Sequence, residues 1–268
     1  MTRTSRLLMG RTLAGLALAL SVSLLLSSQA FAQAGVPPLD HFRCYHTLGT
    51  PLSPTGAPQP VVTLRDQFDP ATSGGEFARV MDAVRLCNPT EKRYLDKITP
   101  ISDPNNHLTM YRIITAQPSI TRIVVVRNQF GLQRLRVGQA EVLAVPTQKL
   151  PHTLPEGLDH FKCYRATGRN INKVVDLNDQ FRPSPQVRVL EPFGFCNPVG
   201  KKHNDVETPI LNPKAHLVCY TTSREPFATG VGIINQFGQQ GLSVYEADLL
   251  CVPSNKLRVN PPVNPPAG

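Results

Sequence analysis

The chain repeats one sequence pattern four times, and this internal repetition constrains the possible fold more than any other feature. The pattern opens with His-apolar-x-Cys-Tyr, continues with Asp/Asn-Gln-Phe and closes with apolar-Cys-x-Pro-x-x-Lys, and only the second copy lacks its two cysteines. A single copy of about 50 residues encloses too little interior to be stable alone. We therefore expect the copies to pack against one another. They open at His41, His107, His160 and His216.

A second level of repetition groups the copies in pairs. The segment Leu39–Phe42 recurs as Leu158–Phe161, at the start of the first and third copies only. The unit that duplicated last is thus a pair of copies, about 110 residues long, which is a common domain size. We therefore predict two tandem domains. Their predicted bounds are 38–149 for the first domain, 150–157 for a linker, 158–256 for the second domain and 257–268 for a Pro-rich tail.

The hydrophobic runs within each copy have the period of β-strands. β-branched runs such as 123–126 and 231–234 precede the Gln-Phe element, and the residues after it, such as 132–137, largely alternate between apolar and polar. Outside the N-terminal leader, only 75–85 is a candidate helix. We expect an all-β fold in which each pair of copies forms a β-sandwich or barrel with pseudo-twofold symmetry.

The N-terminus has the features of a cleaved signal peptide. Arg3, Arg6 and Arg11 precede an apolar stretch of 14 residues, and an Ala-Phe-Ala sequence follows at 30–32. The stretch is shorter than the roughly 20 residues that span a bilayer. We predict that 1–32 is a signal peptide, that the protein is exported (secreted or periplasmic), and that the mature chain has no membrane span. Loss of the three arginines lowers the net charge from +9 to +6.

The six cysteines favour disulfides in an exported chain. The first, third and fourth copies each carry one cysteine in the opening motif and one in the closing motif, whereas the second copy has Met110 and Ala144 at those places. Because this joint loss leaves no cysteine without a partner, we predict bonds within copies, worth about 3–4 kcal/mol each. We expect Met110 to fill the space of the missing bond. The predicted pairs are Cys44 with Cys87, Cys163 with Cys196, and Cys219 with Cys251.

The repeated histidine precedes the opening cysteine by three positions, a spacing that raises the question of a metal site. On a strand, side chains three apart point to opposite faces, so the two cannot chelate one ion. We expect hydrogen-bonded structural imidazoles, and neither a metal nor a cofactor. His46, His152 and His203 lie outside the pattern and are expected at the surface.

The middle motif has an acidic residue in odd copies, Asp66 and Asp179, and an amide in even copies, Asn128 and Asn235. This exchange suits a side chain that hydrogen-bonds a turn, with a calcium ligand as the alternative, and it fits a general base poorly. The Gln and Phe that follow are the same in all copies, and we expect each Phe to anchor the core. The tyrosines of the opening motif are our candidates for a binding face: Tyr45, Tyr111, Tyr164 and Tyr220.

Three motifs in a fixed order, His-Phe-x-Cys-Tyr, Asp-Gln-Phe and Leu-Cys-x-Pro, recur in tandem behind a signal peptide. In this the chain resembles an uncharacterised tandem-repeat domain family of secreted bacterial proteins. The resemblance covers nearly all of the mature chain and implies a secreted repeat protein without catalytic activity. The second copy departs from the pattern at both cysteines.

Two classes of function stay open. We expect a secreted non-catalytic module with a binding or structural role, acting on an unknown extracytoplasmic ligand or protein, because no catalytic motif is present. The alternative is an exported, hydrolase-like enzyme with a site in unit-specific loops, such as the Pro-rich insertion at 49–60. The densest basic stretch, from Arg122 to Arg136, lacks the clustering with aromatics that nucleic-acid binding needs. We expect solvated strand faces there, with weak attraction to anionic surfaces as the alternative.

Overall fold

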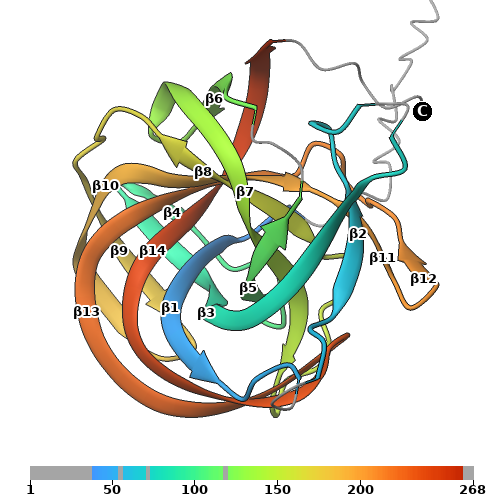
Figure 1. Cartoon of the computed structure of the whole chain (residues 1–268). Helices are drawn as coiled ribbons and strands as arrows, with labels where there is room; N and C mark the ends of the chain where they lie inside the picture. The colour runs from blue at the N-terminus through green and yellow to red at the C-terminus, as the bar shows by residue number, and fades with distance from the viewer. Residues whose placement is uncertain (1–37, 54–56, 71–72, 117–119, 262–268) are drawn as a thin grey trace, which may run out of the picture. The chain divides into compact units, whose positions relative to one another are not determined.

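The computed structural model describes residues 38–53, 57–70, 73–116 and 120–261, and these form an all-β protein without helices (Figure 1). No helix in this described part is long and apolar enough to cross a membrane. The predicted signal peptide at 1–32 lies outside the described residues. Residues 257–260, which we assigned to the Pro-rich tail, belong to a strand that ends at Asn260, and 262–268 lie outside the described residues.

Fourteen strands follow one another through the described residues in the order of the four copies. The first copy forms β1 (His41–Gly49), β2 (Val61–Arg65), β3 (Glu76–Tyr94) and β4 (Lys97–Thr99), and the second forms β5 (His107–Thr115), β6 (Arg122–Asn128) and β7 (Gly131–Lys149). The third forms β8 (Phe161–Thr167), β9 (Lys173–Asp179), β10 (Pro183–Pro198), β11 (Gly200–His203) and β12 (Val206–Thr208), and the fourth forms β13 (His216–Asn235) and β14 (Gly238–Asn260).

The prediction of a helix at 75–85 is wrong, because this segment is the first part of β3. Ala78 and Val80 are buried, while Phe77 and Arg79, which alternate with them, are exposed. This period of two is the pattern of a strand with one face on the core.

Eight strands pair into one closed antiparallel sheet. Within each copy the opening strand pairs with the closing strand, so β1 pairs with β3, β5 with β7, β8 with β10, and β13 with β14. Each closing strand also pairs with the opening strand of the next copy, so β3 pairs with β5, β7 with β8, and β10 with β13. The pairing of β14 with β1, at Cys251 and Phe42, completes the ring.

The arrangement as two separate domains is not confirmed. The two predicted halves meet at both seams of the ring, β7 with β8 and β14 with β1, and Val36–Gly268 forms one compact unit. The predicted linker at 150–157 merely connects two neighbouring strands of the ring. A pair of copies on its own would leave two unpaired strand edges, and closing the sheet with the other pair removes both.

A hairpin arm extends from the ring in each copy. The second strand of a copy pairs with the first part of its closing strand, as β2 does with β3. In the fourth copy, β13 contains both the opening strand and the arm. Each arm also pairs with the copy two places away: β9 with β3, β2 with β11, β6 with β14, and the end of β13 with β7. The first and third copies, and likewise the second and fourth, are therefore interlocked.

Alternation along the ring strands creates two hydrophobic cores. One contains Phe42 and Cys44 and takes members from all eight ring strands. Because residues of β5 and β13, on opposite sides of the ring, line one small cavity within it, this core fills the ring interior. The other contains Tyr45 and lies between the outer face of the ring and the arms.

One end of the ring is covered by loops. Asp40 accepts hydrogen bonds from the backbone N–H groups of Ser102 and Asp103, at 2.6 and 3.2 Å. In the third copy, Asp159 accepts the equivalent bonds from Leu211 and Asn212, at 2.7 and 2.9 Å. The repeated Leu-Asp-His-Phe segment is therefore a capping element of this end.

Candidate functional site

The structure contains the three disulfides that we predicted from the loss of both cysteines in the second copy. Each joins directly opposed residues of an opening and a closing strand, and all three lie in the ring interior. Met110 stands opposite Ala144 in the second copy, and both side chains are buried in the same core. The bonds are Cys44–Cys87, Cys163–Cys196 and Cys219–Cys251.

The four tyrosines do not form the binding face that we predicted for them, because their side chains are buried beneath the arms. Tyr45 and Tyr164 donate hydrogen bonds to Asp179 and Asp66, at 2.7 and 2.8 Å. Tyr111 and Tyr220 accept hydrogen bonds from Asn235 and Asn128, each at 2.8 Å. Every tyrosine thus contacts the copy two places away. Their exposed fractions are 0% for Tyr45, 0% for Tyr111, 7% for Tyr164 and 0% for Tyr220.

The Asp or Asn of the middle motif forms a turn in all four copies, as predicted. Its Oδ1 accepts a hydrogen bond from the backbone N–H of the Phe two residues later, for example 2.7 Å from Phe68 to Asp66 and 2.9 Å from Phe130 to Asn128. That Phe packs on the tyrosine that the turn contacts, with 5.0 Å between the ring centroids of Phe68 and Tyr164. The motif is therefore a structural clamp between copies.

The exchange of Asp for Asn follows the charge of a buried neighbour. The odd copies carry Arg43 or Lys162 between the opening apolar residue and the cysteine, and each lies close to a turn aspartate. The even copies carry Thr109 or Val218 there and face an asparagine turn. A buried cation needs carboxylate partners, so an aspartate in the turn occurs with a basic residue in the opening motif. Lys162 also lies 2.6 Å from Glu76.

The repeated histidines are buried structural groups, as predicted. Gln129 Nε2 donates to His41 Nε2 at 2.6 Å, and His160 Nε2 lies 2.9 Å from Gln236 Oε1. Burial, followed by the positive charge of the closing lysine of the same copy, lowers each pKa. The values are about 3 for His41 beside Lys92, about 3 for His107 beside Lys149, about 4 for His160 beside Lys201 and about 3 for His216 beside Lys256. Within the described ranges, no group of three metal-ligating side chains occurs.

A groove of about 630 Å³ lies at the end of the ring opposite the capping loops, where the opening strands leave the ring. Val84 and Val142 form part of its floor and pack on the interior core. Its volume is in the range of sites that bind small molecules. Other side chains that line it are His46, Asp82, Arg85, Arg112, Glu141, Phe193 and Tyr245.

A network of charged groups forms one wall of this groove. Arg85 binds Asp248 through two hydrogen bonds, Nε to Oδ1 at 2.9 Å and Nη2 to Oδ2 at 2.6 Å. His46 Nε2 lies 2.8 Å from the same Oδ2, and its ring stacks on Tyr245 with 5.7 Å between centroids. Burial lowers the pKa of His46, although Asp248 acts in the opposite direction. His46 is therefore half-buried and bonded rather than a free surface residue, which corrects our prediction.

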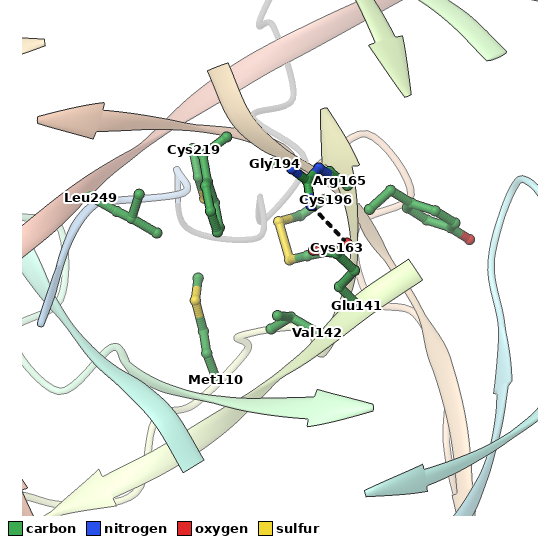
Figure 2. Close-up of a pocket in the computed structure, with 11 residues that line it drawn as sticks. Met110, Glu141, Val142, Cys163, Arg165, Gly194, Cys196, Cys219 and Leu249 are labelled. Carbon is green, nitrogen blue, oxygen red and sulfur yellow. Dashed lines mark ion pairs between the residues drawn. A yellow bond between two sulfur atoms is a disulfide. The ribbon is translucent and has the colours of Figure 1, made fainter. Parts of the chain in front are cut away.

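A smaller cavity of about 20 Å³ adjoins the groove and reaches the ring interior (Figure 2). The Cys163–Cys196 disulfide, Met110 and Leu249 lie around it. The exposed ion pair between Arg165 and Glu141, at 3.7 Å, lies beside it. Glu141, Val142 and Phe193 line both spaces, so the small cavity is an inner extension of the groove.

Two positions that supply groove residues differ between the copies, although the copies share most residues of the three motifs. Two positions after the opening cysteine, or Met110 in the second copy, the four copies carry His46, Arg112, Arg165 and Thr221. Three positions before the closing cysteine, or Ala144, they carry Val84, Glu141, Phe193 and Asp248. The sequence contains this signal as a break in the repeat, but only the closed ring shows that five of these eight residues line one groove: His46, Val84, Arg112, Glu141 and Phe193.

The fold defines a class of protein: a closed antiparallel sheet made from four tandem copies of one repeat. A family model described as a repeat of unknown function (DUF7450) matches residues 107–253, and the chain belongs to this family. The match begins at the opening histidine of the second copy and ends in the closing motif of the fourth. The predicted resemblance to an uncharacterised repeat domain is confirmed at this level. No curated protein and no solved structure matches the chain.

Proposed function

We propose that this protein is an exported, non-catalytic binding module that takes a small polar ligand in the groove at the open end of its ring. One observation carries the proposal. Most of the motif residues that the four copies share are buried or half-buried in the scaffold, whereas the groove is lined by residues at positions where the copies differ, such as His46, Arg112 and Glu141. A symmetric scaffold with an asymmetric opening suits recognition of an asymmetric ligand. The exposed rings of Phe193 and Tyr245 supply contact area beside the charged wall.

Export is part of this proposal. Three disulfides are consistent with an oxidising compartment, since thiols stay reduced in the cytosol. The predicted signal peptide at 1–32 supports secretion or a periplasmic location. Mass spectrometry of the N-terminal peptide of the protein from the exported fraction should show a chain that begins at Gln33, with or without cyclisation to pyroglutamate.

A hydrolase in the groove has less support. Arg85 donates hydrogen bonds to both carboxylate oxygens of Asp248, and His46 Nε2 contacts one of these oxygens. The carboxylate is therefore already engaged in structural contacts. The described part of the insertion at 49–60 bonds elsewhere: Thr50 N donates to the carbonyl of Gly241 at 3.2 Å, and no described insertion residue lines the groove. These contacts favour binding over catalysis.

The test is a screen of wild-type protein against amino acids, dipeptides, monosaccharides and disaccharides, by thermal shift and then calorimetry. A ligand should raise the melting temperature of the wild type but bind the Tyr245→Ala and Arg112→Ala variants at least about tenfold more weakly. Phe77→Ala is the matched control, because Phe77 is 69% exposed and lies outside the groove.

Equal affinity of a ligand for the groove variants and the wild type would place its site elsewhere. Turnover of any compound in the screen, detected by mass spectrometry, would replace the binding module with the enzyme. A screen in which nothing binds the wild type at millimolar concentration would count against a small polar ligand.

A further inference from the structure

Three paired strand segments carry bases and no acids. They are β6, the first part of β7 at 131–137, and the end of β14 at 254–260, which pairs with β6 on its other side. None of these segments contains Asp or Glu. Opposite charges are interspersed elsewhere in the chain, so this part accounts for much of the positive charge of the mature protein.

Alternation turns one face of these strands to the core and the other outward. Val124, Val126 and Leu135 are buried in the core between ring and arms. On the opposite face, Leu132 is exposed and Ile123 and Val125 are half-buried. The arginines on this outer face are all exposed: Arg127, Arg134, Arg136 and Arg258. We call this set of seven residues the basic face.

The register places two of the arginines on either side of a hollow. Val125 stands opposite Arg134 of β7 and opposite Arg258 of β14, so these two arginines are two strand spacings, or about 10 Å, apart. The hollow between them measures about 300 Å³, and Ile123 and Asn260 complete its lining. The sequence alone places Arg258 far from the others, and only the pairing of β14 with β6 brings it to this face.

The four arginines of the basic face form no ion pair within the described ranges. A guanidinium group binds phosphate through two parallel hydrogen bonds and is weakly hydrated, which makes it suited to an anionic partner. Since the three segments themselves carry no carboxylate, the four charges reinforce one another at the surface.

We propose that the basic face docks this protein on membranes that contain anionic phospholipid, with one phosphate headgroup seated between Arg134 and Arg258. The aliphatic side chains among the arginines favour a lipid surface over a purely polar polyanion. Leu132, at 58% exposed, can enter the interfacial region while the guanidinium groups bind phosphates around it. This docking is independent of the ligand groove, which lies at the end of the ring.

The test measures partition of the mature protein onto vesicles of phosphatidylcholine alone and of phosphatidylcholine with phosphatidylglycerol. Wild-type protein should bind the anionic vesicles, and added salt should weaken this binding. Arg134→Gln combined with Arg258→Gln should lower the partition coefficient about 30-fold. The matched control is Arg169→Gln with Lys214→Gln, which removes the same charge from exposed residues outside the basic face and should change binding less than about threefold.

Equal loss of binding in the two double variants would show that only net charge acts, and would overturn the proposed site. Equal binding of wild type to neutral and anionic vesicles, or to neither, would overturn it as well. Retention on heparin without binding to anionic vesicles would assign the face to an acidic polysaccharide instead. Circular dichroism of each variant verifies that the fold is unchanged.

Discussion

Lowering the pH from 7 to 5 should destabilise this protein strongly through its four repeated histidines. Their pKa values in the folded state are about 3 to 4, because burial and a nearby lysine disfavour the charged ring. In the unfolded chain the pKa of a histidine is about 6.5. The unfolded state therefore takes up protons below pH 6.5 that the folded state refuses, so stability is present above this pH and is lost as the pH falls toward the folded values.

The size of the effect follows from these values. Between pH 7 and pH 5, each histidine withdraws about 2 kcal/mol of stability, and the four together withdraw about 8 kcal/mol. Asp69, Asp159 and Asp179 offset part of this loss, since burial raises each pKa and lets the folded state bind protons first. A domain is stable by only about 5–15 kcal/mol, so the protein should be close to unfolding near pH 5.

The assay is urea unfolding at pH 7 and pH 5, followed by circular dichroism because the chain contains no Trp. His160→Gln should lower the difference in unfolding free energy between the two pH values by about 2 kcal/mol. Any packing cost of the substitution is common to both pH values and cancels. His152→Gln is the comparison variant: burial lowers the pKa of His152 as well, and its ring lies 5.5 Å from that of His107, but it is only half-buried, so this substitution should change the pH dependence less than His160→Gln does.

A wild-type protein with the same free energy of unfolding at pH 5 and pH 7 would refute the reasoning. So would a His160→Gln variant with an unchanged pH dependence, since that would place the proton uptake on other groups.

Three further outcomes test the scaffold. Tyr164→Phe removes the hydroxyl donor at 2.8 Å from the buried carboxylate of Asp66, whose Oδ2 then keeps only the longer bond from Asn197 at 3.2 Å, and should cost about 1–3 kcal/mol in urea unfolding; an unchanged midpoint would show that the clamp does not stabilise the fold. Met110→Cys with Ala144→Cys should form a fourth disulfide, visible as the absence of free thiols, and add about 3–4 kcal/mol; two persistent thiols would contradict the strand register. A protease cut introduced within 150–157 should leave the fragments associated as one folded unit, whereas two halves that separate in gel filtration would restore the two-domain arrangement.

The local sequence determined the parts that repeat. The loss of both cysteines in the second copy was sufficient to predict the disulfides, because two cysteines that form a bond are retained together or lost together. The exchange of Asp66 for Asn128 between copies predicted a turn, since either side chain can accept the hydrogen bond from the N–H two residues on. Strand content followed from the alternation of apolar residues, except at 75–85, where the exposed Phe77 breaks the apolar-in, polar-out alternation.

Tertiary structure alone decided how the copies are joined and which residues meet. Two domains and one ring satisfy the same local patterns, and the ring is formed because β14 pairs with β1 and leaves no edge exposed. Tyr45 was expected at the surface because its partner, Asp179, lies 134 positions away in the copy across the ring. Arg85 and Asp248, which are 163 positions apart, meet in the groove for the same reason. Sequence periodicity specifies which face of a strand is buried, but the strands that cover that face are chosen only when the sheet closes.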